Sequence, residues 1–303
     1  LPVNKGQSNF DEISYEYYRD RDVATEAFKS GAFDLRAENQ SKRWATAYDF
    51  PALKEGKVKK ILIPHERPTG MQGFVFNTRK NFFSDPKVRL AINYAWDFEW
   101  TNKTLMYNAY KRTNSYFSNS ELSSSERLPD GEELKILQKF KGQVPKQVFD
   151  EVYKAPQTDG SGNNRKNLRL ALKLLREAGW TVKDGKLINS KGIPLKFELL
   201  IAYPSIERLA LPLKQSLKRL GIEMSIRTVD VAQYQQRVDT FDFDMIVSSF
   251  GQSLSPGNEQ RDFWHSTNAN RPGSRNLIGI KEPAIDKLVE LVIESPDRES
   301  LIF

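Results

Sequence analysis

The alternation of helix-like and strand-like segments between residues 165 and 250 constrains the fold more than any other feature of the sequence. Three segments with apolar residues at helical spacing alternate with three strand-like runs: 165–178, 195–201, 205–220, 222–228, 231–238 and 243–249. Helices that connect successive strands in this way build a mostly parallel sheet with helices on its faces. We therefore predict an α/β fold with mixed, mostly parallel sheets and flanking helices.

The segment that follows the last strand-like run is the candidate binding loop, because parallel sheets bind ligands beyond the carboxyl ends of their strands. It covers residues 250–262 and combines amide, hydroxyl and charged side chains with small residues, which suits hydrogen bonding to a polar ligand. Composition alone leaves a solvated connection equally open. The candidate ligand-binding residues are an apolar wall at Phe250, the polar residues Gln252, Ser253, Ser255, Asn258, Glu259 and Arg261, and Asn77 at the end of an earlier strand.

The N-terminal region predicts a separate compact βαβ unit. Strand-like runs at 13–17 and 33–36 flank a short helix at 22–30. A lysine-rich stretch follows, and the proline-bracketed segment 64–68 then interrupts the pattern. We predict a domain crossover there.

Capping residues and prolines predict where several helices of the remaining chain begin. After a strand at 73–77, Asp85 and Asp97 are expected to cap two successive helices, and Asn164 a third. An amphipathic helix is expected at 282–294, followed by Ser295-Pro296-Asp297, with the proline at the first position of a new helix. The chain stops soon afterwards and has no Met at its start, so we expect it to be a fragment.

The residues needed for catalysis or metal binding are sparse. There is no cysteine, which excludes a disulfide framework and a thiol nucleophile. The two histidines, His65 and His265, lie far apart, and neither has a second ligand at metal-binding spacing. No G-x-S-x-G, P-loop or G-x-G-x-x-G motif occurs. We predict no catalytic residue, no metal and no cofactor. A peptide or murein-fragment hydrolase remains the alternative.

Charge and hydropathy narrow the class of partner. The formal net charge is +7, but the basic residues are dispersed among acidic ones and no block of five or six like charges occurs. A nucleic-acid-binding module would need a focused basic patch, so we predict no nucleic-acid partner. No apolar run approaches the roughly 20 residues that span a bilayer.

Several motifs, in matching order along nearly the whole chain, resemble those of a known family. They are Phe74–Thr78 with Asp85–Asp97, Leu220–Met224, Asp242–Met245, and Asn276–Gly279 with Ile285–Leu288. The chain resembles the family 5 (cluster C) extracellular solute-binding proteins, the peptide and nickel binders of ABC importers. The Ser255–Gln260 loop with Phe263-Trp264 is most similar to the YejA-type branch, which is associated with oligopeptides and microcin C.

This resemblance implies a two-lobed fold of the periplasmic binding protein type II class. Residues 1–64 would form part of lobe I, 65–280 lobe II, and 281–303 the return toward lobe I. It also implies a periplasmic, monomeric receptor that captures oligopeptides or peptide-like solutes, such as microcin C-type compounds or murein peptides. The receptor would deliver them to an ABC permease in the inner membrane.

The sequence departs from the family at one position of the binding loop. Many peptide binders of the family carry an Asp shortly before the proline of this loop, and it pairs with the free amino terminus of the ligand. Here residues 252–255 contain no acid, and a neutral amide cannot give the charge-assisted pairing. The resemblance therefore does not carry recognition of a free amino terminus over to this position, where Glu259 is the nearest acid.

Overall fold

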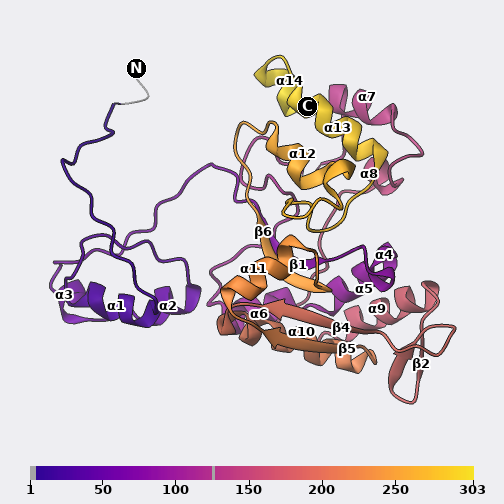
Figure 1. The fold of residues 1–303 in the computed structure, drawn as a ribbon, viewed down its shortest axis with the longest axis horizontal. Coiled ribbons are helices and arrows are strands. Elements are labelled where there is room, and N and C mark those ends of the chain that lie inside the picture. The colour runs from indigo at the N-terminus through magenta and orange to yellow at the C-terminus, as the bar shows by residue number, and fades with distance from the viewer. Residues whose placement is uncertain (1–4, 125–126) are drawn as a thin grey trace. The chain divides into compact units, whose positions relative to one another are not determined.

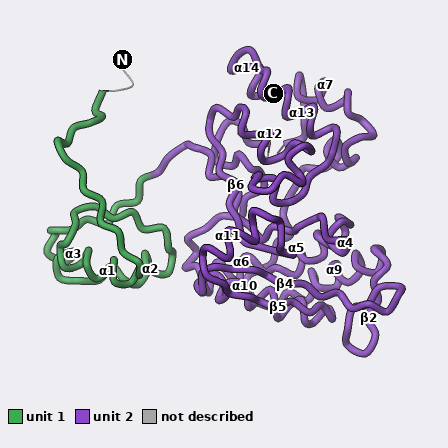
Figure 2. The backbone as a smooth tube through the Cα atoms, in the orientation of Figure 1, with its two compact units in different colours: residues 1–63 green, residues 64–303 purple. Residues whose placement is uncertain are grey.

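The computed structural model describes residues 5–124 and 127–303, which divide into two compact units. Unit 1 covers residues 1–63 and unit 2 covers residues 64–303 (Figure 2). The boundary falls at the start of the proline-bracketed segment. None of the helices in the described residues has the length and hydrophobicity needed to cross a membrane.

Unit 1 contains three helices, α1 (Arg21–Lys29), α2 (Ser41–Thr46) and α3 (Pro51–Lys54). The two predicted strands at 13–17 and 33–36 are wrong, because no strand forms among residues 5–63. The side chains that suggested the first strand, Ile13, Tyr15 and Tyr17, are all exposed. Alternating side chains give a strand its two faces, but the ladder also needs a neighbouring strand. The described part of unit 1 supplies none.

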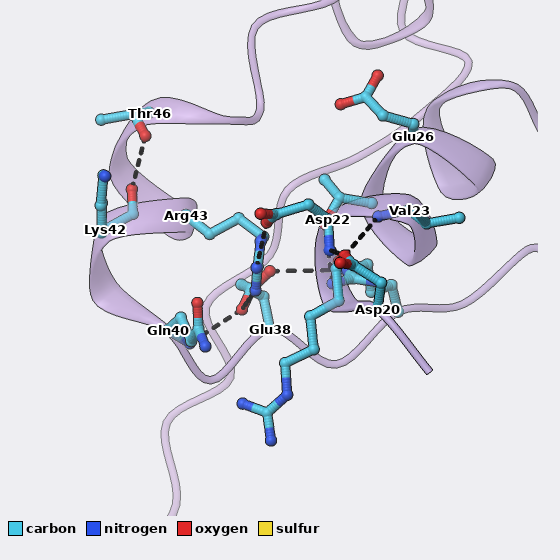
Figure 3. Close-up of polar contacts among 12 residues, drawn as sticks. Asp20, Asp22, Val23, Glu26, Glu38, Gln40, Lys42, Arg43 and Thr46 are labelled. Carbon is cyan, nitrogen blue, oxygen red and sulfur yellow. Dashed lines mark hydrogen bonds and ion pairs between the residues drawn. The ribbon is translucent and has the colours of Figure 1, made fainter. Parts of the chain in front are cut away.

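Polar contacts around Glu38 join two of the helices of unit 1, α1 and α2 (Figure 3). Arg43 of α2 donates to Asp22 of α1 at 2.7 Å and lies 3.6 Å from Glu38 Oε1. The Glu38 carboxylate also accepts from the Gln40 N–H at 2.9 Å and from the Tyr48 hydroxyl at 3.0 Å. Burial, together with the hydrogen bond to Glu38, raises the pKa of Tyr48. Through these bonds Glu38 and Arg43 join α1, α2 and the segment between them.

Unit 2 is built around a four-stranded sheet in the order β1–β6–β4–β5 (Figure 1). The strands are β1 (Met71–Phe76), β4 (Lys196–Ile201), β5 (Glu223–Thr228) and β6 (Met245–Phe250). β4 runs parallel to both β5 and β6, whereas β1 is antiparallel to β6. The prediction of a mixed, mostly parallel sheet with flanking helices is confirmed.

Helices cover both faces of this sheet. On one face α5 (Pro86–Ala95), α9 (Arg165–Glu177) and α10 (Pro204–Arg219) share a core with Leu199. On the other face α11 (Val231–Asp239) shares a core with the next residue, Leu200. Consecutive strand residues point to opposite faces, and both leucines are fully buried. β4 is therefore a central strand covered on both sides, as in other parallel sheets.

Two of the three predicted helix caps are confirmed. Asp85 accepts a hydrogen bond from the Lys87 N–H at the start of α5. Asp97 accepts from the Trp100 N–H at the start of α6 (Phe98–Leu105). Asn164 precedes α9, but its side chain makes no cap. It donates instead to the carbonyl of Tyr94 at 3.0 Å, because it is buried against the end of α5.

Apolar periodicity did not predict several short elements. They are α4 (Asn81–Ser84), α7 (Gly131–Gln138), α8 (Gln147–Asp150) and the hairpin strands β2 (Thr181–Lys183) and β3 (Lys186–Ile188). The hairpin turns at Asp184 and Gly185, both of which have positive φ. Asp-Gly is favoured in two-residue hairpin turns for this reason, so this dipeptide was a usable signal that the sequence analysis missed.

The C-terminal elements of unit 2 are α12 (Glu259–Trp264), a 3₁₀ turn η2 (Ser266–Asn268), α13 (Pro283–Ile293) and α14 (Arg298–Ile302). α13 confirms the helix predicted at 282–294. The prediction that Pro296 occupies the first position of the last helix is wrong. Asp297 is the N-cap and accepts from the Ser300 N–H at 2.8 Å, so the helix begins after it.

Candidate ligand-binding site

The predicted binding segment 250–262 is only partly a loop. Phe250 is the last residue of β6, residues 251–258 form the loop, and α12 begins at Glu259. The loop thus leaves the carboxyl end of a strand whose neighbour β4 is parallel to it, as predicted. Arg298 of α14 donates to the Leu254 carbonyl and to Glu121, which holds the loop beside the segment 114–124.

Three aromatic side chains, which we call the aromatic wall, meet next to this loop: Phe250, Tyr116 and Trp264. Phe250 stacks on Trp264 with 5.2 Å between ring centroids, and Tyr116 contacts both rings edge-on at 5.6 and 4.6 Å. Burial raises the pKa of Tyr116 to about 12, so its hydroxyl remains protonated at neutral pH. The wall joins β6, α12 and a segment far away in the sequence.

A pocket of about 440 Å³ opens against this wall. Most of its lining is apolar or aromatic: Met71, Tyr116, Phe117, Leu122, Tyr153 and Trp264. Polar groups come from Asn114, Ser115 and Ser124. Small-molecule sites typically combine an apolar lining with a few polar groups that orient the ligand. The pocket has this composition, and it lies entirely within unit 2.

Gln252 and Glu259 take part in one hydrogen-bond network, which reaches the aromatic wall through Gln260. The indole N–H of Trp264 donates to Gln260 Oε1 at 2.9 Å. Gln260 Nε2 donates to Gln252 Oε1 at 2.7 Å and to Glu259 at 3.2 Å. Among the described residues, Gln252 Nε2 has no acceptor although it is shielded from solvent. A buried donor without a partner costs roughly 1–3 kcal/mol.

Electrostatics keep Glu259 ionised. Burial raises the pKa of its carboxyl, but hydrogen bonds from the Gly257 N–H, its own N–H and Gln260 outweigh burial and lower the pKa overall. The Gly257 N–H donates to this carboxylate at 2.9 Å. Glu259 is therefore a hydrogen-bond acceptor that closes the end of the loop.

The remaining predicted loop residues lie apart from this network. Ser253 and Ser255 are exposed, and the Ser255 N–H donates to Ser253 Oγ at 3.2 Å. Arg261 makes a two-pronged pair with Glu290 of α13, with Nε at 2.7 Å, and also donates to Asn258 at 2.8 Å. Arg261 thus connects α12 to α13, and Asn258 accepts a hydrogen bond from its guanidinium.

Asn77 has a structural position that the sequence analysis did not foresee. It is buried, and its amide nitrogen donates to the carbonyls of Phe241 and Phe243 at 3.0 and 2.8 Å. Its oxygen accepts from Arg79 Nη1 at 2.9 Å. Arg79 in turn donates to the carbonyls of Ala269, Asn276 and Leu277. The geometry therefore does not favour the prediction that Asn77 lines the ligand cleft.

Sequence reasoning missed Tyr116, Gln260 and Tyr153. Tyr116 and Tyr153 lie in segments without clear periodicity, and only tertiary structure brings them to the pocket. Gln260 is part of the predicted segment but was passed over among other polar residues. Its 4% exposure marks it as a buried polar residue, and burial is what the sequence could not reveal.

The described residues contain no group of three acidic, histidine or cysteine side chains placed to hold a metal ion. His265 Nδ1 lies 2.9 Å from the Thr267 hydroxyl and accepts from the Thr267 N–H at 3.2 Å. His65 accepts from the Arg67 N–H at 3.3 Å. Each histidine therefore has a local partner in its own turn.

A family model described as "Bacterial extracellular solute-binding proteins, family 5 Middle" matches residues 3–271. The chain is 50% identical to uncharacterized protein y4wM of Sinorhizobium fredii, with 100% of this chain and 46% of that protein covered. It is 48% identical to the probable peptide-binding protein YejA of Agrobacterium fabrum, with 99% and 49% covered. It is also 40% identical to the peptidoglycan-binding protein YepA of the same species, with 99% and 50% covered. The chain thus spans about half the length of these relatives.

Solved structures show the same fold at lower identity. The oligopeptide-binding protein AppA of Bacillus subtilis, in complex with a nonapeptide, matches with a TM-score of 0.65 at 21% identity, covering 93% of this chain and 48% of that one. NikA of Brucella suis matches with a TM-score of 0.59 at 20% identity, covering 94% and 50%. The predicted fold class, periplasmic binding protein-like type II, is confirmed. With the motifs, the topology and the family model in agreement, this chain belongs to family 5 of the bacterial extracellular solute-binding proteins.

Proposed function

We propose that this chain is part of the substrate-binding component of an ABC importer, which captures oligopeptides or peptide-like solutes and delivers them to an inner-membrane permease. The observation that carries the proposal is the apolar pocket beside a hydrogen-bonding loop at the carboxyl end of β6. The relatives named as peptide-binding and peptidoglycan-binding proteins support it. Microcin C-type compounds and murein peptides are the finer candidates.

The mechanism we propose is capture without covalent chemistry. Residues 1–64 would contribute to one lobe and 65–280 to the other, and 281–303 would return toward the first. Closure of two lobes around a ligand buries it and creates a new surface for the permease. The aromatic wall would contact apolar side chains of the ligand, and Gln252, Ser253, Ser255, Asn258, Glu259 and Arg261 would offer polar contacts from the loop and α12. The family assignment favours action in the periplasm, as a monomer.

A thermal-shift titration of the full-length protein with a peptide mixture tests this function, followed by mass spectrometry of the bound material. Binding to the native state raises the melting temperature as ligand concentration exceeds the dissociation constant. We expect an increase, with intact peptides recovered. If no peptide shifts the melting temperature, the protein is not a peptide receptor. If the peptides are recovered cleaved, the hydrolase alternative is correct.

A further inference from the structure

The net positive charge of the chain is concentrated in one part of unit 2. Residues 165–196 contain nine basic and two acidic side chains, and this excess equals the formal net charge of +7 of the whole chain. These residues form α9, the β2–β3 hairpin and the segment that leads into β4. Figure 1 shows α9 and β2 in the lower half of unit 2, away from α12 and α14 at its top. The fold thus gathers charges that are spread along the sequence.

The exposed side of α9 is almost entirely cationic. Its apolar side is buried in the core of unit 2 through Leu168, Ala171 and Leu175. Five exposed cations cover the opposite side, which we call the basic face: Arg165, Lys166, Arg169, Lys173 and Arg176. The one acid of the helix, Glu177, pairs with Lys87 of α5 at 3.2 Å. Among the described residues, no carboxylate forms an ion pair with the basic face.

This arrangement costs α9 some stability. Arg169 has a like charge four residues away on each side, at Arg165 and Lys173, and such pairs destabilise a helix. Arg165 and Lys166 also lie in the first turn, where the helix dipole favours anions over cations. A face that only contacts water gains nothing from this repulsion, whereas a bound polyanion offsets it.

The composition of the face favours a phospholipid surface over a nucleic acid. The exposed residues of 165–196 include no aromatic side chain, because Trp180 is buried, and single strands are bound by stacking their bases on aromatic rings. The exposed side of α9 also has no amide or hydroxyl side chain to contact base edges in a duplex. Arginine and lysine remain, and both pair with phosphate oxygens.

We propose that the basic face docks on an anionic phospholipid surface through the headgroup phosphates. The inference goes beyond the proposed function and takes from it only the nearby inner membrane. Because the apolar side of α9 is already buried in unit 2, the helix does not insert among the acyl chains, and the contact is electrostatic. None of the five cations lines the pocket, so docking does not use the solute site.

Co-sedimentation of the full-length protein with vesicles tests this docking, in the absence of peptide. One set of vesicles is phosphatidylcholine alone, and the other is an equal mixture of phosphatidylcholine and phosphatidylglycerol. We expect binding to the mixture only, and we expect it to weaken steadily as salt is added, because exposed charges are screened. Equal binding to both sets, or binding that salt does not weaken, would overturn the inference.

A triple variant of the basic face, Arg165→Gln with Arg169→Gln and Lys173→Gln, tests the location of the contact. Each cation near an anionic surface contributes about fivefold in affinity, so we expect the variant to bind the mixed vesicles about 100-fold more weakly. Its melting temperature should be at or above that of wild type. Both like-charge pairs are gone, and glutamine forms helices about as well as arginine and lysine. Loss of docking is thereby separated from loss of the fold.

The matched control removes three exposed lysines elsewhere in unit 2, with Lys139→Gln, Lys141→Gln and Lys287→Gln. It lowers the net charge by the same amount. We expect its vesicle affinity to stay within about twofold of wild type, since charges farther than a Debye length from the lipid contribute little. An equal loss in the two triple variants would show that net charge, rather than the basic face, attracts the protein, and would overturn the inference.

A DNA duplex tests the other class of polyanion. If the duplex binds more tightly than the mixed vesicles and the basic-face variant loses that binding, the face is a nucleic-acid site and the inference is wrong. Peptide titration decides the proposed function separately. A protein that binds peptides but no vesicles keeps the proposed function without this inference, and one that binds vesicles through the basic face but no peptide keeps only the inference.

Discussion

Buried asparagines of the family motifs hold segments of unit 2 together. Asn77 follows β1 and bonds to the backbone just before β6, whereas Asn276 accepts from the N–H groups of Gly279 and Ile280 at 2.9 and 2.8 Å. Arg79 joins the two motifs, with its guanidinium 3.8 Å above the Phe241 ring. Burial lowers the pKa of Arg79 to about 10, so it stays charged at neutral pH. These motif residues therefore position the strand ends that carry the site.

Replacing Asn77 tests this structural role. Asn77→Ala leaves the carbonyls of Phe241 and Phe243 and two N–H donors of Arg79 without their partner, so we expect the free energy of unfolding to fall by about 2–3 kcal/mol. Urea denaturation measures the loss, and Asn163→Ala, at an exposed asparagine, is the control. Peptide affinity of the folded variant should stay within about twofold of wild type, because Asn77 does not line the pocket. A large loss of affinity at unchanged stability would show that Asn77 is a ligand contact.

Tyr153 tests the location of the pocket. It lines the pocket but is 57% exposed, so its removal should cost little stability. We expect Tyr153→Ala to weaken peptide binding by about tenfold, since aromatic contacts are frequent energetic anchors. Tyr110→Ala, at a tyrosine of similar exposure outside the pocket lining, is the matched control. Equal affinities of the two variants, measured by calorimetry on the full-length protein, would move the ligand away from this pocket.

At the scale of elements, α12 connects the site to α13. Its N-terminal residue Glu259 closes the binding loop, and its last residue Trp264 belongs to the aromatic wall. Between them Arg261 pairs with Glu290 of α13. The hydrogen bond from Arg261 holds the pKa of Glu290 below its ordinary value. A change in the packing of α12 against α13 therefore reaches both the loop and the wall.

The pH dependence of stability tests this helix pair. The pKa of Glu290 is lower in the folded than in the unfolded protein, so the pair stabilises the fold above the unfolded-state pKa. That stability is lost as the pH falls through the folded-state pKa. We expect Glu290→Gln to melt below wild type at about pH 7 and together with it at about pH 3. Glu66→Gln, at an exposed loop glutamate, should follow wild type throughout. A difference in melting temperature that persists at low pH would mean that packing, rather than charge, accounts for the effect.

At the scale of the whole molecule, the apolar core is unevenly divided between the two units. Both clusters of buried apolar residues lie in unit 2. Among residues 5–63, only Phe50 and Thr25 are buried. Hydrophobic burial is the main favourable term in folding, so unit 2 contains most of the stabilising contacts. The pocket and the hydrogen bonds among Trp264, Gln260 and Gln252 also lie in unit 2.

Expressing the two units separately tests this division. We expect residues 64–303 to unfold in one cooperative transition, because they contain both cores. Residues 1–63 alone should show no cooperative transition, since their small buried core does not offset the loss of chain entropy. Circular dichroism against temperature and urea is the measurement. An unfolded 64–303 fragment, or a cooperative 1–63 fragment, would contradict this expectation.

Much of the fold of unit 2 could be predicted from the sequence, and less of the site. The loop after β6 was predicted because parallel sheets bind ligands beyond the carboxyl ends of their strands, and the last strand of the alternating pattern ends there. Phe250, Gln252 and Glu259 are part of the resulting geometry. Arg261 was predicted as a ligand contact but pairs with Glu290, a residue whose position depends on how α13 packs. The lobe assignment and the ligand contacts remain predictions.

The sequence by itself determined three helices and three strands between residues 165 and 250, though not the β2–β3 hairpin, because the spacing of apolar residues indicates which face of each element is buried. Tertiary structure decided the rest. The runs at 13–17 and 33–36 alternate in the same way, yet the described residues of unit 1 supply no neighbouring strand to complete a ladder. The hydrogen bond between Gln260 and Gln252 forms because α12 packs against the end of β6, where Trp264 stacks on Phe250. A hydrogen bond depends on both of its partners. The sequence alone does not show which residues the fold brings within hydrogen-bonding distance.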